Sequence, residues 1–598
     1  MGSREMASHA VDPIRNGSPN GKSNMYASQK NVQILVALMK EHGVRHVVIS
    51  PGSRNLALVR SLEGDGFFTC YSVVDERSAA YFAIGVSQET GGPVALSSTS
   101  AQATRNYIPG MTEAFYRGTP LVVITADYKP SVIGQGVMQS LDQMSIPKDS
   151  AKVSVRLPIV RDADDEWYCG RLVNEALLGL SHMGGGPVHI DMPVEEHWEG
   201  SVSTLPPVKK IERFVPRMHA LPEIRARRVL VALGQHAPFT PDEEDALARF
   251  AARYGAVVYT NHLSNYHGAG AANGSLAIQN MDHKTMMAYR PDLVITVGGQ
   301  IGDYGIDSFL NAVRPEHWRV AEDGAIVDTY KTLTKVFQFR AVDFFDDYAS
   351  MAKENASTEY QELWAKANAK RSIPDTLPLS HAFAAAVLAP KIPQHSVMHF
   401  AILSALRNWN FFSLDPTVAS YSNVAGFGID GCLSTFVGHS VATDKLSFLV
   451  IGDLSFFYDM NAIGIRHVKP NARILLINNG GGGEFRLYSH AAERNFGADA
   501  DIHMAAAGHH GAARAWVESM GWDYIEVRRK EDLLASADVF VGESERPILM
   551  EVFTTMKNDS VGVRVIREAN THESLERRLA KALPPGVKRI AKTILGRQ

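Results

Sequence analysis

Residues 452–479 read GDLSFFYDMNAIGIRHVKPNARILLINN, and both ends of this stretch follow an apolar run. The run LSFLVIGD (446–453) ends at Asp453, and the run ARILLINN (472–479) ends at Asn479. One helix and one strand separate the two polar residues. In a doubly wound parallel sheet, ligands bind outside the carboxyl ends of the strands. We therefore expect Asp453 and Asn479 to lie together at one edge of such a sheet.

The residue types at this edge favour a Mg²⁺ ion and a diphosphate. Asp453 offers a carboxylate, Asn479 an amide oxygen and Gly481 a backbone carbonyl, which are the hard oxygen ligands that Mg²⁺ prefers. Glycines at 480–483 allow the backbone to approach a diphosphate closely. The alternative is that Gly-Asp is an ordinary turn and Asn-Asn-Gly-Gly an ordinary loop. Both halves at strand ends, with this spacing, favour the ligand site.

The same alternation of short apolar strands with helical patterns extends over most of the chain. It recurs from about residue 29 to 193, from 227 to 299 and from 380 to 556. Such alternation predicts an α/β protein with three doubly wound parallel-sheet domains. The predicted boundaries are a disordered extension at 1–24, a domain at 25–200, a linker at 201–222, a central α/β domain at 223–350, a linker at 351–378, a domain at 379–560 and a helical tail at 561–598.

Composition excludes several classes of protein. The 598 residues are 45% hydrophobic and 21% charged, with a net charge of -4, which indicates neither a nucleic-acid nor a membrane partner. No apolar run reaches the ~18 residues of a membrane helix, and residues 1–24 lack the apolar core of a signal peptide. Cys70, Cys169 and Cys432 are far apart, which argues against disulfides and zinc. We expect a cytoplasmic protein.

The spacing of Gly-Asp and Asn-Asn resembles the signature of thiamine-diphosphate (ThDP) enzymes. With Leu454 after the Asp, GDLSFFYDMNAI is similar to the 2-succinyl-5-enolpyruvyl-6-hydroxy-3-cyclohexene-1-carboxylate (SEPHCHC) synthase family of the menaquinone pathway. The resemblance covers most of residues 29–200 and 395–490. It is carried also by SPGSR (50–54), DERSA (75–79), TAD (125–127), GPVH (186–189) and SNVAGFGIDGCLST (422–435).

This resemblance implies a fold of the ThDP-dependent decarboxylase type. The 25–200 domain would bind the pyrimidine and the 379–560 domain the diphosphate. Glu76 would be the catalytic carboxyl that hydrogen-bonds the aminopyrimidine, with a raised pKa; the alternative is that it belongs to a helix cap. Ile429 would hold the cofactor bent, or else fill the core. Implied cofactor residues are Ser100, Gly428, Ile429, Asp430, Gly452, Asp453, Leu454, Ser455, Asn479 and Gly481, with Asp453, Asn479 and Gly481 as metal ligands.

The resemblance also implies an assembly. The chain would be a homodimer or a dimer of dimers, with Glu76 of one chain facing Asp453 of the other.

The chain departs from the family at positions that would contact substrate. Val424, Ala405 and Tyr128 replace family arginines, Ala401 replaces a serine, and Tyr304-Gly305 aligns with a Lys-Arg pair. In the family these cations hold the carboxylates of 2-oxoglutarate and isochorismate. Two residues along a helix turn through about 200°, so Arg407 is expected to point away from the Ala405 direction. Predicted substrate residues are Arg54, Arg105, Gln139, His399, Glu484 and Arg486.

These observations predict a decarboxylating carboligase that joins a 2-oxo acid donor to a carbonyl or enone acceptor. Its donor and acceptor would differ from those of the family, with a small or neutral donor such as pyruvate. The alternatives are SEPHCHC synthase itself, a simple 2-oxo acid decarboxylase, or an inactive scaffold. An inactive scaffold requires loss of Glu76, Asp453 or Asn479, all of which are present. A dinucleotide-dependent oxidoreductase needs GxGxxG after a strand, which we do not find.

Overall fold

The structure is a computed structural model that describes residues 25–571, except 101, 195–197, 199, 212–220, 279–280, 326, 353–355 and 370. The predicted extension at 1–24, residues 572–598 of the predicted tail and residues 212–220 of the first predicted linker lie outside the described residues. In the described part of the tail, helix α19 (Met556–Ala569) continues across residue 561.

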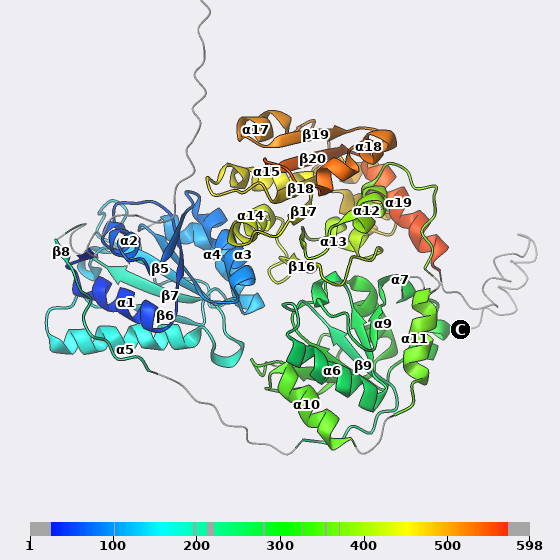
Figure 1. The fold of residues 1–598 in the computed structure, drawn as a ribbon, viewed down its shortest axis with the longest axis horizontal. Helices are drawn as coiled ribbons and strands as arrows, with labels where there is room; N and C mark the ends of the chain where they lie inside the picture. The colour runs from blue at the N-terminus through cyan, green and yellow to red at the C-terminus, as the bar shows by residue number, and fades with distance from the viewer. Residues whose placement is uncertain are drawn as a thin grey trace, which may run out of the picture.

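Three parallel six-stranded sheets organise the described residues, which confirms the predicted α/β class (Figure 1). The N-terminal sheet contains β2 (His46–Ile49), β3 (Thr69–Ser72), β4 (Val94–Ser98), β5 (Leu121–Asp127), β6 (Val153–Arg156) and β7 (Val188–Pro193). The central sheet contains β9 (Val229–Leu233), β10 (Val257–Thr260), β11 (Ala271–Asn273), β12 (Leu293–Val297), β13 (Glu316–Val320) and β14 (Leu333–Phe337). The C-terminal sheet contains β15 (Val397–Phe400), β16 (Ala419–Ser422), β17 (Ser447–Gly452), β18 (Ala472–Asn478), β19 (Asp523–Val527) and β20 (Ile548–Phe553).

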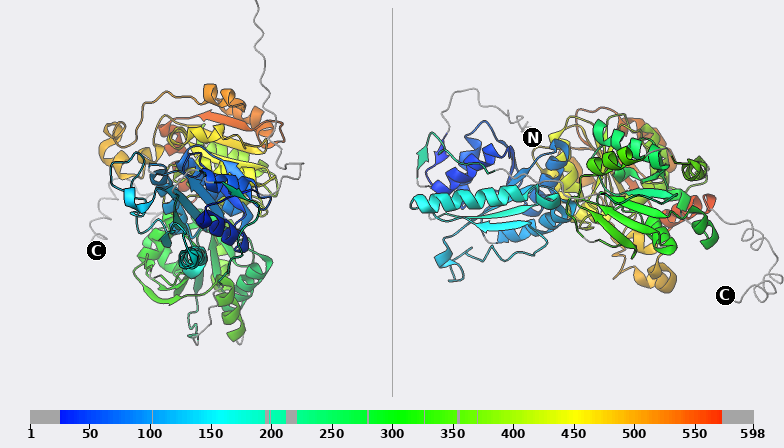
Figure 2. Two further views of the ribbon diagram at one scale, coloured as in Figure 1. Left: turned by 90° about the vertical axis from the view of Figure 1, so that its left-hand side faces the viewer. Right: turned by 90° about the horizontal axis from the view of Figure 1, so that it is seen from below.

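Helices cover both faces of these sheets, and the N-terminal unit lies to one side of the other two (Figure 2). The first unit carries α1 (Lys30–Glu41), α2 (Leu56–Glu63), α3 (Glu76–Thr90), α4 (Gln102–Arg117) and α5 (Ala163–Gly179). The central unit carries α6 (Pro241–Tyr254), α7 (Ser275–Ile278), α8 (His283–Tyr289), α9 (Tyr304–Val313), α10 (Ala341–Met351) and α11 (Glu359–Ala369). The last unit carries α12 (His381–Leu388), α13 (Ser404–Trp409), α14 (Cys432–Ala442), α15 (Asp453–Tyr458), α16 (Ala491–Phe496), α17 (Arg514–Ser519), α18 (Lys530–Val541) and α19.

Strand order places the Gly-Asp and Asn-Asn motifs together. The C-terminal sheet has the order β16-β15-β17-β18-β20-β19, so β17 and β18 are neighbours. Their parallel register pairs Gly452 with Ile477. Asp453 and Asn479 therefore leave the sheet side by side at its carboxyl edge, close to the point between β15 and β17 where the strand order reverses.

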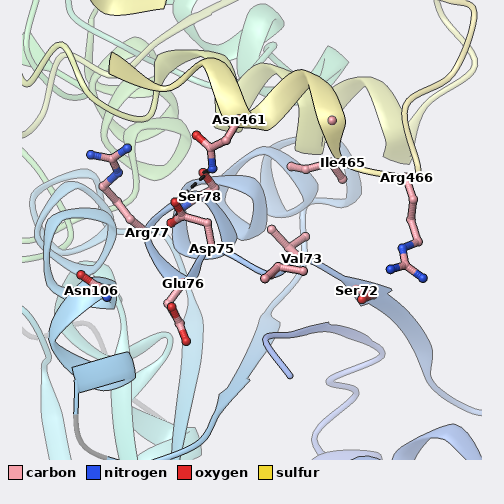
Figure 3. Close-up of a pocket in the computed structure, with 12 residues that line it drawn as sticks. Ser72, Val73, Asp75, Glu76, Arg77, Ser78, Asn106, Asn461, Ile465 and Arg466 are labelled. Carbon is pink, nitrogen blue, oxygen red and sulfur yellow. Dashed lines mark hydrogen bonds between the residues drawn. The ribbon is translucent and has the colours of Figure 1, made fainter. Parts of the chain in front are cut away.

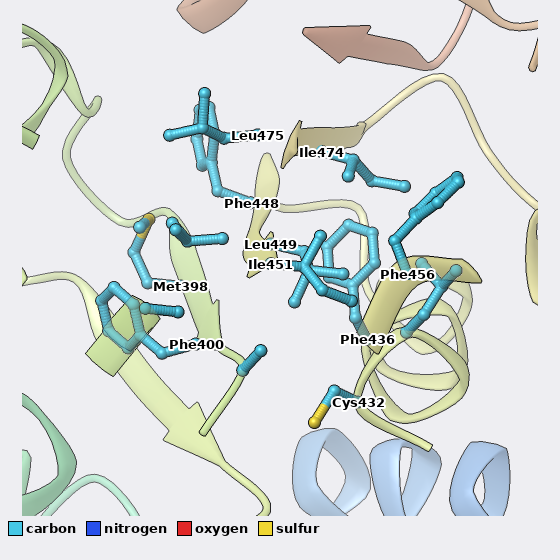
Figure 4. Close-up of a cluster of buried hydrophobic side chains, with 14 of the residues drawn as sticks. Met398, Phe400, Cys432, Phe436, Phe448, Leu449, Ile451, Phe456, Ile474 and Leu475 are labelled. Atoms are coloured by element: carbon cyan, nitrogen blue, oxygen red, sulfur yellow. The ribbon is translucent and has the colours of Figure 1, made fainter. Parts of the chain in front are cut away.

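The N-terminal and C-terminal units share one hydrophobic core across helices α3 and α14. A Cβ added at Gly85 of α3 would lie 2.0 Å from the backbone oxygen of Thr435, and one added at Gly438 of α14 would lie 2.1 Å from that of Phe82. The two helices thus approach backbone to backbone through glycine. Figure 4 shows the adjoining core, where side chains of β15, β17, β18 and α14 meet.

Two stretches predicted as linkers contain regular structure. In 351–378, α11 packs Tyr360 and Trp364 into the core of the central unit. These aromatic side chains lie one helical turn apart in an otherwise polar stretch, so they form a narrow buried face that the overall polarity masks. In 201–222, β8 (Ser201–Val202) pairs antiparallel with β1 (Tyr26–Ala27). Among the described residues no helix is long and apolar enough to cross a bilayer.

Candidate active site

The carboxyl edge of the C-terminal sheet holds Asp453 in a cluster of backbone amides. Asp453 is 2% exposed. Its Oδ2 accepts hydrogen bonds from the N–H groups of Asn479 (3.0 Å), Gly480 (2.8 Å) and Gly481 (3.1 Å). Its Oδ1 accepts one from Leu454 (2.7 Å). Burial raises the pKa of Asp453, and these amides oppose that rise.

The side-chain oxygen of Asn479 shares the Gly481 amide with Asp453. The Gly481 N–H lies 3.1 Å from Asp453 Oδ2 and 3.2 Å from Asn479 Oδ1. The Asn479 amide is oriented by its own Nδ2, which donates to Asp559 Oδ2 at 2.8 Å. Asp559 is buried in α19, and sequence reasoning missed it because it lies 80 residues further along the chain. The carboxylate and amide oxygens therefore converge as the motif predicts.

The glycine loop after β18 packs against residues 505–509. A Cβ at Gly481 would lie 2.8 Å from the Cα of Ala507, and Gly508 N–H donates to Gly480 O at 3.1 Å. His509, also missed by sequence reasoning, brings its Nε2 to 3.2 Å from Asp453 Oδ2. The GHHG stretch (508–511) was the available signal, because histidine is a frequent functional side chain and the flanking glycines allow a close approach of the backbone.

The loop that carries Gly428, Ile429 and Asp430 is held from both sides. Ser455 Oγ donates to the Ile429 carbonyl at 2.6 Å, and Tyr81 donates to Asp430 Oδ2 at 3.1 Å. The side chain of Ile429 stays 38% exposed, so it is not core filler in this chain. A Cβ at Gly428 would lie 2.3 Å from Asp430 Oδ1, so a larger residue there would displace the Asp430 side chain.

A buried carboxylate of α4 supports the same loop. Glu113 accepts hydrogen bonds from the N–H groups of Ala425 and Gly426, and burial raises its pKa. This contact joins the N-terminal unit to the loop of the C-terminal unit that leads to Gly428, Ile429 and Asp430. It could not be predicted because 312 residues separate Glu113 from Ala425.

Glu76 lies at the first turn of α3, on the wall of a cavity of about 680 Å³. Asp75, and not Glu76, caps the helix through Ser78 N–H at 3.1 Å. Burial raises the pKa of Glu76, in the expected direction. Asn461 holds Asp75 from the C-terminal unit, and Figure 3 shows Glu76 pointing away from that contact. Ser100, further along the same unit, is buried, and its hydroxyl has no hydrogen-bond partner among the described residues.

Three predicted substrate residues lie in the N-terminal unit. Arg54 stacks over the ring of Tyr128 at 3.8 Å, so two residues that the sequence analysis assigns to the substrate side contact each other. Arg105 donates to the carbonyls of Asp142 (2.9 Å) and Ser145 (2.6 Å). Gln139 is exposed with a left-handed backbone (φ 61°) in the same loop region.

Two predicted substrate residues lie in the 3-10 helix η6 (Gly483–Arg486) and are separately paired. Glu484 forms an ion pair with Arg407, and Arg407 stacks over Tyr304 at 4.1 Å. Arg486 pairs instead with Glu493 and Asp501, each at 2.8 Å. Arg407 lies two residues after Ala405 in α13, so its side chain points in a different direction from that of Ala405. In that direction it pairs with Glu484.

The prediction that His399 contacts substrate is contradicted by its position. His399 is buried in β15, stacked on Tyr421 and edge-on to Phe436 and His439. Burial lowers its pKa far below the ordinary value, so it is a neutral core side chain. Alternate residues of a strand point to opposite faces, and aligned motifs near the end of β15 did not reveal which face His399 takes.

Among the described residues no group of three His, Cys, Asp or Glu side chains is placed to hold a metal ion. A cation here would need amide and carbonyl oxygens beside a single carboxylate, which is the donor set that Asp453, Asn479 and Gly481 provide.

The sequence and fold match known ThDP enzymes. Residues 29–146 match the family described as thiamine pyrophosphate enzyme, N-terminal TPP binding domain. A SEPHCHC synthase of Bacteroides thetaiotaomicron is 36% identical over 90% of this chain and 98% of its own, and one of Phocaeicola vulgatus is 36% identical with the same coverage. A ThDP-dependent 4-hydroxybenzoylformate decarboxylase of Rhodococcus jostii RHA1 shares the fold, with a TM-score of 0.62, 17% identity and coverage of 88% of this chain and 99% of the other. The chain therefore belongs to the SEPHCHC synthase family of ThDP-dependent enzymes.

Proposed function

We propose that this chain is a ThDP- and Mg²⁺-dependent carboligase that decarboxylates a 2-oxo acid and transfers the remaining acyl carbon to a carbonyl or enone acceptor. The observation that carries the proposal is the convergence of Asp453 Oδ2 and Asn479 Oδ1 on the Gly481 amide. Mg²⁺ takes such oxygens and keeps positions for diphosphate oxygens. Asp453, Asn479 and the Gly481 carbonyl would hold the ion.

The protein would bind, bend and shield the cofactor. When bound, ThDP supplies a carbon nucleophile and an electron sink for the loss of CO₂. Glu76 would share a proton with the ring nitrogen of the aminopyrimidine, and its raised pKa suits that role. Ile429, held by Ser455 and still partly exposed, would press between the two rings. Ser100, Gly428, Asp430, Gly452 and Leu454 would complete the cofactor contacts.

The substrate side favours a small or neutral donor. Val424 and Ala405 are buried apolar residues where the family has arginines. Arg407 forms an ion pair with Glu484, and Arg486 forms one with Glu493. The positive charge of each arginine is therefore already balanced by a glutamate. A second carboxylate on the donor would be buried without a partner, which costs several kcal/mol. Pyruvate or a similar donor avoids that cost, and Arg54, Arg105 and Gln139 would contact the substrate.

A second candidate is SEPHCHC synthase activity itself, from 2-oxoglutarate and isochorismate. The relatives that carry this name align over 90% of the chain at 36% identity, and that observation favours it. A tenfold or greater preference for 2-oxoglutarate over pyruvate in kcat/KM, with consumption of isochorismate, would establish this candidate and refute the altered donor site.

The same proposal includes a cytoplasmic homodimer, or dimer of dimers, with shared sites and no nucleic-acid or membrane partner. Among the described residues, the cavity at Glu76 is lined by Asn461 and Ile465 of the C-terminal unit but not by Asp453, Asn479 or Gly481. A second copy would be needed to bring its Asp453 to Glu76.

Calorimetry of ThDP binding with and without Mg²⁺ tests the cofactor assignment. Asp453→Asn keeps an oxygen for the loop amides but removes the charge, so we expect ThDP affinity to fall at least 100-fold, or about 2.8 kcal/mol. Asp444→Asn is the matched control, because Asp444 is 98% exposed in the same unit. ThDP affinity that is unchanged in EDTA and in Asp453→Asn would refute the assignment. Product analysis with a panel of 2-oxo acids then identifies the donor.

A further inference from the structure

Asp559 of α19 joins three segments of the C-terminal unit beside the proposed metal site. It is 6% exposed. The His381 N–H donates to its Oδ1 at 2.8 Å, while Asn479 Nδ2 (2.8 Å) and the Thr554 hydroxyl (3.1 Å) donate to its Oδ2. A carboxylate only accepts hydrogen bonds. Both oxygens of Asp559 therefore face donors that suit them.

The two ends of the Asn479 amide are distinguished by their partners. Its Nδ2 faces the carboxylate of Asp559, and its Oδ1 lies 3.2 Å from the Gly481 N–H. The oxygen and the nitrogen of an asparagine side chain have nearly the same shape, so the surrounding hydrogen bonds decide which of them points where. Because Asp559 binds the amino group, the oxygen is the end that meets the Gly481 amide beside Asp453 Oδ2.

The first residue of α12 fixes the orientation of the group at position 559. The backbone N–H of His381 can only donate, so it must face an acceptor. In the isosteric variant Asp559→Asn, the amide oxygen would stay at His381 and the new amino group would replace Oδ2. That amino group would point at the amino group of Asn479. Asn479 avoids this contact by turning over, which directs its own Nδ2 toward the glycine loop.

We infer that Asp559 is a positioning residue for metal binding, which presents the oxygen of Asn479 to the cation by binding the amino group of the same amide. The inference rests on the proposed function and deepens its metal site. Mg²⁺ binds oxygen ligands, whereas the hydrogens of an amino group carry positive charge and repel it. A chain of hydrogen bonds from the backbone of α12 through Asp559 to Asn479 thus determines which atom the ion meets.

Asp559→Asn should weaken Mg²⁺ binding about 10–100-fold, the usual effect of removing a partner that orients a metal ligand. Calorimetric titration of Mg²⁺ into the full-length enzyme mixed with ThDP measures the Kd. Glu568→Gln is the matched control, because it makes the same change of carboxylate to amide at an exposed position of α19. We expect its Kd to stay within twofold of the wild-type value.

The variant Asn479→Asp separates orientation from structural support. A carboxylate presents an oxygen whichever way it turns, so position 479 no longer needs to be oriented. In this background Asp559→Asn should not weaken Mg²⁺ binding, because the amide at position 559 can donate to the carboxylate at position 479. A role of Asp559 in folding alone predicts the same loss in both backgrounds, as does the mere removal of its charge.

A loss of Mg²⁺ affinity confined to the wild-type background supports the inference. Equal losses in the two backgrounds overturn it, as do a loss below twofold in the wild-type background and an absence of Mg²⁺ binding by the double variant. Thermal unfolding of the metal-free proteins is the second measurement, and Asp559→Asn protein that is unfolded in both backgrounds also overturns the inference. ThDP binding by the wild type without Mg²⁺ contradicts the proposed function as well, whereas Mg²⁺-dependent wild-type binding with equal losses contradicts the inference alone.

Discussion

Gly85→Ala tests the contact that joins the N-terminal and C-terminal units. The added Cβ would lie 2.0 Å from the backbone oxygen of Thr435 and 2.6 Å from the backbone nitrogen of His439. Both atoms belong to the backbone of α14, so no side chain can rotate to make room. Ordinary contact needs about 3.5 Å, and α3 and α14 must therefore separate by more than about 1 Å. Such overpacking costs about 3 kcal/mol.

The helix propensity of alanine partly hides this cost, because alanine gains about 1 kcal/mol over glycine inside a helix. Gly170→Ala is the matched control, since Gly170 lies within α5 and nothing lies within 4 Å of its added Cβ. We expect Gly170→Ala to be stabilised by up to about 1 kcal/mol and Gly85→Ala to be destabilised by about 2 kcal/mol. Differential scanning calorimetry and urea unfolding measure both. Equal stability of the two variants would refute the backbone contact.

Three further predictions concern the site and its support. Glu76→Gln should slow C2–H exchange of bound ThDP, measured by NMR, by about 10²–10⁴-fold; full exchange would move the role to another residue. Mixing Glu76→Gln with Asp453→Ala protein should restore activity in heterodimers, because one hybrid site is intact, and no recovery in confirmed heterodimers would count against a shared site. Burial and the charge of Asp127 raise the pKa of Asp191. A raised folded-state pKa contributes stability below the unfolded pKa of about 3.9 that is lost as pH rises. Asp191→Asn also weakens the contact with Arg156, so the expected result is that the Tm of the variant relative to the wild type is more favourable at pH 8 than at pH 5, and a constant difference would contradict this.

The parts of the fold that local patterns encode could be predicted. Apolar runs alternating with helical patterns predicted parallel sheets in three units, and the spacing of Asp453 and Asn479 predicted that they would lie together. The prediction for Asp453 and Asn479 is reliable because β17 and β18 are neighbouring parallel strands of similar length and end at the same edge of the sheet. The roles of these residues in binding Mg²⁺ and ThDP stay predictions.

Other features depend on contacts that no local pattern records. The helix α11 looked like a linker because only three of its 11 residues, Tyr360, Trp364 and Ala367, are buried. His399 looked like a substrate residue because its neighbours in sequence align with a substrate motif, whereas its strand turns it into the core. Asp559 and Glu113 reach their partners across 80 and 312 residues.

The sequence by itself determined the fold class, the family and the edge of the sheet where the cofactor motif lies. These follow from hydrophobic periods of two and 3.6 residues and from short strings of fixed spacing, which act over one or two elements. Only the tertiary structure decided which charges are satisfied. Glu484 and Arg407 lie 77 residues apart, and their pairing follows from how η6 and α13 pack against each other. The energy of a charge depends on its nearest partners and on its burial, and both are set only once the chain is folded.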